Sequence, residues 1–460
     1  MKAGFARLEI TPPLGINLAG YFHLRPADGI LTPLYVNALV LDDGENRAAL
    51  LTLDLEGMTR ENNVYLREQI AKATGIDPQA IFIHCTHTHQ GPENGQYDDP
   101  EKRTPYDSYL IHRVCDSVVL AIEEMAGTGQ AKLHIATGKA QGISFIRLFK
   151  KKDGTFQVRP DPTDPEYAGP AGEPDEAVQL VRITREGAKD IAIAHFSTHP
   201  DVIGCKKICH DWPGYVREFM ERSLCDVAEG KGVHALCMNG AQGDVNHINY
   251  LLPGKPVIGV EHAKHMARVI TGEVMKLYTY ARETDGSQLL FRQIPVRLKT
   301  NKASPKELEM SRKVKEIQDR GGYKAVAAAR EAGLVDHDIY QATKNLLLES
   351  WPEEKDVFIS ALAVGEVVFV GFPGEPFTQV GRQTKAASPF AMTLPCCHGN
   401  GGEGYFPTQD VFTGGAYEAN TSRFTVGAAE KLTEAAIELI RELFEQKPEA
   451  GAAKAGIVCG

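Results

Sequence analysis

Three histidines lie within six positions in the stretch IFIHCTHTHQGPEN, which follows an apolar run and precedes Gly-Pro. His87 and His89 are two residues apart, and alternate residues of an extended segment share a face, so both imidazoles can point into one cleft. Imidazole is a common ligand of zinc. The pair therefore predicts a metal-ligand position. His84 is an odd number of residues from both and is predicted to pack against the opposite face of the sheet.

Further groups that could bind a metal follow other apolar strands. His199 lies in HFSTHP and Glu375 in FPGEPF. Catalytic zinc sites use histidine and carboxylate ligands and keep one position open. A glutamate at a strand exit can alternatively be the first acid of a helix. The glycine-rich stretch MNGAQGDVN can cradle a substrate or simply make a turn, and it lacks the Gly-Lys-Ser/Thr of a phosphate-binding loop.

Cys205, Cys209 and His210 offer an alternative, a structural zinc knuckle, but no second cysteine pair has matching spacing. Asp54 and Asp211 are predicted either to orient the ligating histidines or to cap turns.

Positioning these groups requires alternating strands and helices, which predict a layered α/β fold with a mixed β-sheet flanked by helices. Many of the strands are continuous runs of Val, Ile, Leu and Ala, as expected when both faces of a sheet are covered. The predicted strands are Leu34–Leu41, Ala48–Leu53, Ile81–Cys85, Lys132–Ala136, Val178–Ile183, Ile191–Phe196, Ala235–Met238, Leu289–Val296, Val357–Leu362 and Val367–Val370. The predicted helices are Thr59–Thr74, Tyr106–Met125, Pro213–Val227, Val260–Tyr278 and Thr425–Phe444.

The remaining segments set the domain organisation. Residues 153–176 are rich in proline, glycine and acid and predict a long surface loop. Residues 304–350 predict a helical insertion. We expect a single domain over 1–446, followed by a flexible tail over 447–460. The sequence shows no internal repeat.

Composition excludes several partners. The chain has 460 residues and a formal net charge of -10, and no basic run exceeds Lys150–Lys152, which argues against nucleic acid. No apolar segment reaches the roughly 18 to 20 residues that span a bilayer, so no stable membrane association is expected. The N-terminus lacks an apolar signal region, and the nine cysteines are scattered, so a cytoplasmic location is predicted. A small-molecule substrate is expected, and homo-oligomerisation is left open.

Taken in order, these motifs resemble the catalytic domain of the neutral/alkaline, non-lysosomal ceramidase family. Glu9-Ile10-Thr11-Pro12-Pro13 with Gly20-Tyr21 is similar to the family's opening, and Thr86-His87-Thr88-His89-Gln90-Gly91-Pro92 to its His-Thr-His signature. His199, the 239–246 loop and Gly374-Glu375-Pro376-Phe377 resemble further family segments. Tyr405 and Tyr417, the latter in Tyr417-Glu418-Ala419, resemble its pair of active-site tyrosines.

The resemblance implies one catalytic zinc per chain and a metal-activated water that attacks an amide carbonyl. The metal ligands that it implies are His87, His199, Glu375 and Tyr405. It gives His89 the role of general base or hydrogen-bond partner, places Arg147 in the active site, and lets Tyr417 stabilise the oxyanion.

Two departures from the family narrow this expectation. Asn246 stands where the family carries an active-site serine, and asparagine cannot act as a nucleophile. The chain also ends soon after the last predicted helix, where ceramidases continue into a β-sandwich domain. We therefore expect a zinc-dependent hydrolase for the N-acyl amide of a small soluble substrate. An esterase, another hydrolase or a non-catalytic ligand-binding protein remain alternatives.

Overall fold

The computed structural model describes residues 1–159, 161, 163–225, 227–228, 230–252 and 257–447. Within them, three large sheets follow one another along the chain and repeat one topology. In each, three antiparallel strands form a meander, a helix crosses over, and a fourth strand pairs parallel to the third. A further helix then follows. The sequence shows no repeat, yet the fold is built from three topologically equivalent units.

The elements of each unit follow the same order: meander strands, crossover helix, fourth strand and second helix. The first unit comprises β1 (Lys2–Glu9), β3 (Tyr35–Asp42), β4 (Arg47–Leu53), α1 (Arg60–Thr74), β5 (Ile81–Cys85) and α2 (Pro105–Ala126). The second comprises β6 (Ala131–Lys139), β11 (Ala177–Arg185), β12 (Asp190–Phe196), α3 (Asp211–Ser223), β14 (Val233–Asn239) and α4 (Val260–Tyr278). The third comprises β17 (Leu289–Lys299), β18 (Glu354–Val364), β19 (Val367–Gly371), α7 (Thr378–Ala387), β21 (Met392–Cys396) and α10 (Ala428–Glu445).

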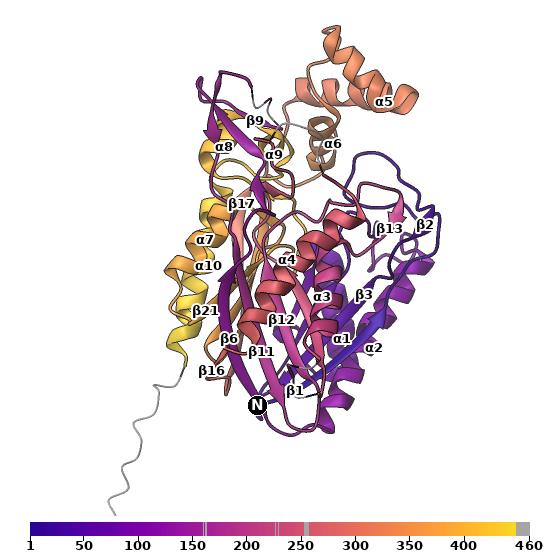
Figure 1. The fold of residues 1–460 in the computed structure, drawn as a ribbon. Helices are drawn as coiled ribbons and strands as arrows, with labels where there is room; N and C mark the ends of the chain where they lie inside the picture. Colours follow the sequence, from indigo (N-terminus) through magenta and orange to yellow (C-terminus); the bar gives the residue numbers. More distant parts are fainter. Residues whose placement is uncertain (160, 162, 226, 229, 253–256, 448–460) are drawn as a thin grey trace, which may run out of the picture.

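The helices lie on the outside of the molecule, and the three sheets pack against one another in its interior. In Figure 1, α3 and α4 lie in front of the second sheet, α7 and α10 along one side of the molecule, and α1 and α2 along the other. One hydrophobic cluster contains inward-facing residues of all three sheets, among them Ile83, Leu236 and Phe369. Burying one such side chain contributes about 1.5–3 kcal/mol. The layered α/β architecture predicted from the strand–helix alternation is confirmed.

All ten predicted strands and all five predicted helices are present; β5 and α4 have the predicted bounds, and the others are shifted at one or both ends. Every residue of β5, β12 and β19 is buried, which explains why these strands are mostly apolar, with His84, Asp190 and His195 as the exceptions. Helix α2 begins with a capping box, in which Thr104 and Asp107 satisfy each other's backbone amides.

The predicted helical insertion is confirmed between β17 and β18. It consists of α5 (Pro305–Glu331) and α6 (Ile339–Leu348), which project beyond the ends of the sheets (Figure 1). Helix α5 is interrupted at Gly322, whose φ is 67°. The insertion therefore stands over the end of the molecule at which the strand exits meet.

The prediction of a long surface loop over 153–176 is wrong in part, because the segment contains two short strands. Strands β9 (Phe156–Val158) and β10 (Tyr167–Pro170) flank β8 (Leu148–Lys151) in a small antiparallel sheet. Phe156 is buried there and packs in a hydrophobic cluster with Ile146 and Leu148, which the proline-rich composition of the segment does not indicate. The predicted tail lies outside the described residues from 448 onward.

Short pairings complete the fold. They are β2 (Gly29–Ile30) with β13 (Lys207–Ile208), β7 (Phe145–Ile146) with β15 (Val245–Asn246), and β20 (Glu375–Pro376) with β22 (Tyr405–Phe406). The remaining short elements are β16 (Arg282–Thr284), which extends the second sheet, η1 (Pro78–Ala80), α8 (Gln409–Gly414) and α9 (Tyr417–Thr421).

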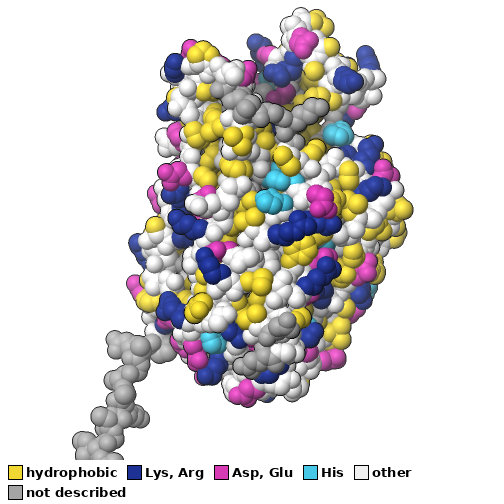
Figure 2. Space-filling model, viewed as in Figure 1, with side chains coloured by type: hydrophobic (Ala, Val, Ile, Leu, Met, Phe, Trp, Pro, Cys, Tyr) yellow, Lys and Arg dark blue, Asp and Glu magenta, His cyan; other side chains and the backbone are white. Residues whose placement is uncertain are grey.

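The surface carries charges of both signs. On the face shown in Figure 2, lysine and arginine side chains are interspersed with aspartate and glutamate. Within the described part of the chain, none of the helices has the length and hydrophobicity needed to span a bilayer.

Candidate metal centre

The carboxyl ends of β5 and β12 bring three imidazoles together. His87 Nε2 lies 3.2 Å from His89 Nε2 and 3.2 Å from His199 Nε2. The His87 ring is nearly perpendicular to both, at 89° and 84°. All three side chains are buried. Their ligand nitrogens lie within 4.8 Å of one another.

A carboxylate completes this cluster from the third unit. Glu375 Oε2 lies 3.3 Å from His87 Nε2 and 3.5 Å from His199 Nε2. Gln242 Nε2 also donates to this oxygen, at 3.2 Å. Each unit therefore contributes to the centre, which holds the His and Glu ligand types of hydrolytic zinc sites.

Backbone carbonyls orient the two central histidines. His87 Nδ1 lies 2.7 Å from the Glu56 carbonyl oxygen, and His199 Nδ1 lies 3.2 Å from that of Gln242. A carbonyl only accepts, so each Nδ1 donates and each Nε2 is left to face the cluster. Metal-binding histidines are commonly held in this way. The donor set fits a divalent cation.

The charge balance of the cluster agrees with this assignment. Burial lowers the pKa of His87, but the adjacent Glu375 carboxylate outweighs it and raises that pKa to about 9. Burial lowers the pKa of His89 to about 4 and holds that of His199 well below its usual range. Two neutral imidazoles thus surround one His87–Glu375 ion pair. A metal ion bound there takes the place of the His87 proton.

The two predicted tyrosines line the same cavity. Tyr405 is the register partner of Glu375 in the β20–β22 pair, which places it beside the cluster, and its ring is near-parallel to that of His199 at 6.4 Å. Tyr417 packs edge-on against Tyr405, with ring centroids 5.7 Å apart. Burial raises the pKa of both phenols above their usual range, so both are hydroxyl donors without a metal.

Arg147 and Asn246 are not among the residues that line the cavity. Arg147 Nε donates to Glu418 at 2.8 Å, and its guanidinium carbon lies 5.4 Å from the centroid of the Tyr405 ring. Asn246 Oδ1 accepts from Ile248 N at 2.8 Å. These contacts position Tyr405 and a turn, and direct roles for both residues in catalysis stay predictions.

His398, after β21, is a site residue that the sequence reasoning missed. It is 4% exposed, its φ is 45°, and neither ring nitrogen has a hydrogen-bond partner. Its ligand atom groups with those of His87 and Glu375 within 4.8 Å. The local sequence signal for it is the glycine-rich stretch HGNGGEGY, because closely spaced glycines let the backbone approach another group.

The strand exits are joined by a hydrogen-bonded seam. His84 Nε2 accepts from Asn239 N at 3.0 Å, and His84 Nδ1 donates to the Cys397 carbonyl at 2.8 Å. Cys397 N donates to the Asn239 carbonyl at 3.2 Å. The fourth strands of all three units therefore meet at these residues. His84 lies outside the metal cluster.

Gly20 lets the backbone approach His89 closely. Its φ is 86°, and a Cβ there would lie 2.4 Å from His89 Nδ1. A larger residue would displace this imidazole.

Of the two roles left open for Asp54 and Asp211, the structure does not show the orienting one. Asp54 accepts from Arg217 and Tyr35 N, and Asp211 accepts from the backbone amides of Val202 and Trp212. The alternative of a structural zinc knuckle is not supported either. His210 pairs with Glu218, and the metal-type clusters in the described residues include neither Cys205 nor Cys209.

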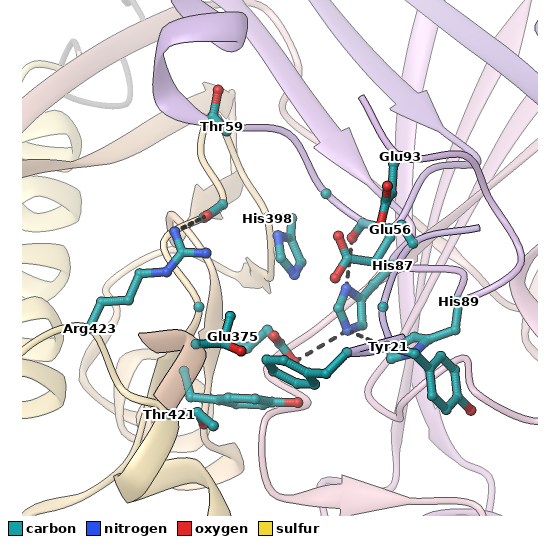
Figure 3. A pocket seen from close by; sticks show the side chains of 18 of the residues that line it. Tyr21, Glu56, Thr59, His87, His89, Glu93, Glu375, His398, Thr421 and Arg423 are labelled. Atoms are coloured by element: carbon teal, nitrogen blue, oxygen red, sulfur yellow. Dashed lines mark hydrogen bonds and ion pairs between the residues drawn. The ribbon is translucent and has the colours of Figure 1, made fainter. Parts of the chain in front are cut away.

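The cluster lies at the base of a cavity of about 440 Å³. Helix α6 of the insertion lines the cavity through Tyr340, Thr343, Lys344 and Leu347. Tyr340 packs edge-on against Tyr417 with centroids 5.0 Å apart. Figure 3 shows Glu56, His87, His89 and Tyr21 on one side of the cavity, and Arg423 and Thr421 on the other. The insertion thus forms one wall of the site.

Comparison with known proteins shows the fold. No family model and no curated protein matches the sequence. The structure is similar to neutral ceramidase from Pseudomonas aeruginosa, with a TM-score of 0.72 and 16% identity over 97% of this chain and 75% of that one. It is also similar to a ceramidase complexed with C2, with a TM-score of 0.70 and 15% identity over 98% and 76% of the two chains. The chain has the ceramidase fold.

Proposed function

We propose that this chain is a metal-dependent hydrolase that cleaves an N-acyl amide bond of a small substrate. One observation carries the proposal. The Nε2 atoms of three buried histidines and a Glu375 oxygen converge at the base of a cavity. A zinc or similar ion at such a position lowers the pKa of water and polarises a carbonyl.

The chain's own residues supply the remaining functions. His87, His199 and Glu375 hold the ion, with Tyr405 beside them. His89 is neutral and has an unpartnered Nδ1, so it can accept a proton from the attacking water or serve as a further ligand. Tyr417 presents a neutral hydroxyl that can donate to the developing oxyanion.

Cavity size supports a small substrate. About 440 Å³ falls within the range of small-molecule sites and leaves little room for two long acyl chains. The shared ceramidase fold favours an amide over an ester. A cytoplasmic location and homo-oligomerisation stay predictions.

A substrate screen tests the reaction type. The purified chain should release amine from short N-acyl amines faster than alcohol from matched acyl esters. A chelator should abolish this turnover, and added zinc should restore it. Turnover that survives removal of all metal would contradict the proposal. A metal-loaded protein that cleaves none of these compounds would favour a ligand-binding role.

Tyr417→Phe tests the oxyanion donor. The variant should bind metal as the wild type does, while its kcat falls by about 10²- to 10³-fold, the usual effect of losing such a donor. Thr421→Val, in the same short helix and lining the same cavity, is the matched control and should retain kcat within a few-fold. An unchanged kcat in Tyr417→Phe would exclude this role.

A further inference from the structure

The cavity above the candidate metal centre has walls of opposite charge. Glu56 and Glu93 line it together with the histidines, and Figure 3 shows both acids on the side of His87. Lys344 and Arg423 also line the cavity, and Figure 3 shows Arg423 on the opposite side. Among the described residues that line it, these two are the only lysine and arginine. A substrate with one charged end is therefore oriented by the cavity.

Lys344 brings an ammonium group to this wall without an ion-pair partner among the described residues. Its Nζ donates to the Asn301 carbonyl at 3.4 Å. Burial lowers the pKa of Lys344, and the charge of Glu307 raises it only in part, because Glu307 caps helix α5 at Ser304. A charge that burial separates from water is stabilised by a partner of opposite sign. An anion beside Lys344 would supply that partner.

The guanidinium of Arg423 is only partly used by the protein. Its Nη1 donates to the Gly402 carbonyl at 3.0 Å. Nη1 also lies 3.6 Å from Glu403, but Lys355 contacts the same carboxylate more closely, at 3.1 Å. Nε and Nη2 have no hydrogen-bond partner within the described part of the chain, and Figure 3 shows the guanidinium directed into the cavity. These free donors match the geometry of a carboxylate.

The two cations are neighbours, and the tyrosines separate them from the metal centre. Asn301 joins the cations, because its N–H donates to the Arg423 carbonyl at 2.9 Å while its own carbonyl accepts from Lys344. Lys344 follows Tyr340 by one turn on the same face of α6. Tyr340 in turn packs against Tyr417, the proposed oxyanion donor. An anion bound at Lys344 therefore belongs to the end of the substrate that is remote from the scissile bond.

The charge of the two walls favours a group with a single negative charge. Lys344 and Arg423 carry two positive charges, and Glu403 offsets part of the charge on Arg423. Glu56 and Glu93 across the cavity oppose any further negative charge. A carboxylate therefore fits this wall better than a doubly charged phosphate does.

We propose, on the basis of the hydrolase function proposed above, that the substrate is an N-acyl amide that carries a carboxylate, as N-acylated amino acids do. Lys344 and Arg423 bind this carboxylate, and the scissile amide lies at the metal centre. The two residues determine specificity and take no part in the bond cleavage.

Matched pairs of amides test this substrate class. N-acetylphenylalanine differs from N-acetylphenethylamine only by a carboxylate on the amine half, and N-succinylbenzylamine differs from N-propionylbenzylamine only by a carboxylate on the acyl half. In at least one pair, the zinc-loaded wild type should have a kcat/KM about 10- to 100-fold higher for the carboxylate, the usual effect of a hydrogen bond to a charged group. The pair that shows the preference identifies the half of the substrate that Lys344 binds.

The outcomes separate the two proposals. Equal kcat/KM values within both pairs would overturn the carboxylate site and leave the hydrolase proposal standing. A zinc-loaded protein that cleaves none of the four amides would overturn both proposals.

Lys344→Met tests the residue. Methionine keeps an unbranched side chain that suits a helix and removes the charge. The carboxylate preference should fall about tenfold, mainly because KM for the carboxylate substrate rises. Because the preference is a ratio measured on one preparation, it does not depend on how much of the variant is folded.

Lys324→Met is the matched control. It removes an exposed lysine from α5 of the same insertion, away from the residues that line the cavity, and should keep the wild-type preference. A wild-type preference in Lys344→Met would overturn the role of Lys344. An equal loss in both variants would assign the preference to the overall charge of the insertion and would also overturn that role.

Discussion

His87→Asn should abolish both metal binding and turnover. His87 belongs to both groups of potential metal ligands found in the described residues, so its loss removes a ligand from each group. Its φ is 70°, a conformation that asparagine tolerates, so the variant should fold. Without the His87 imidazole, which lies between them, His89, His199 and Glu375 would no longer form a complete ligand set. We expect a loss well beyond the roughly 10- to 100-fold effect of removing a group that only orients a ligand.

Metal analysis and activity on the same preparations check this result. His265→Asn changes a histidine on α4 outside the centre and should retain the metal content and activity of the wild type. Equal metal in His87→Asn and wild type would remove the basis for the site assignment, whatever the activity.

Asn239→Ala should destabilise the fold and weaken metal binding together. The Asn239 side chain is fully buried, accepts from Thr198 N at 3.3 Å and donates to the Thr86 carbonyl at 3.3 Å. Alanine would leave both backbone groups buried without these partners. At about 1–3 kcal/mol for each group, the free energy of unfolding should fall by about 2–6 kcal/mol.

Urea denaturation measures this loss, and zinc titration measures the coupling to the site. Asn46→Ala, in the turn between β3 and β4, is a matched control that should change stability by less than about 0.5 kcal/mol. If Asn239→Ala unfolds at the same urea concentration as the control, the side-chain hydrogen bonds of Asn239 do not stabilise the fold. Normal zinc affinity in a destabilised Asn239→Ala would show that the Asn239 side chain stabilises the fold without positioning the ligands.

The elements that could be predicted from the sequence are those whose burial gives them an apolar sequence pattern. Strands β5 and β19 are buried on both faces and are therefore apolar throughout, apart from His84 in β5. Strand β1 was missed because KAGFARLE has a half-exposed pattern with two basic residues. Strand β21 was missed because MTLPC contains Pro395, which usually argues against a strand.

The candidate site shows the same division. The two-residue spacing of His87 and His89 can be recognised within one short segment. His199, Glu375 and Tyr405 are far from it in sequence and were assigned to the same site only through the family resemblance. The groups that orient His87 and His199 are the carbonyls of Glu56 and Gln242, which every residue type possesses. No side-chain pattern can reveal such backbone carbonyls. The sequence therefore offers only side chains, such as those of Asp54 and Asp211, as candidates for orienting the histidines. No other histidine lies near His398 in the sequence, and only the fold, which brings the ends of β5 and β21 together, places it against His87.

Because the three units follow one another along the chain, the residues of the centre are synthesised at different times. His87 and His89 belong to the first unit to leave the ribosome, His199 to the second, and Glu375, His398 and Tyr405 to the third. At roughly 5–20 residues per second, the first imidazoles precede the carboxylate by tens of seconds. During that interval the nascent chain presents histidines without their acidic partner. The proposed metal can therefore meet its complete ligand set only after the third unit has been synthesised, and a truncated chain that lacks this unit would lack Glu375.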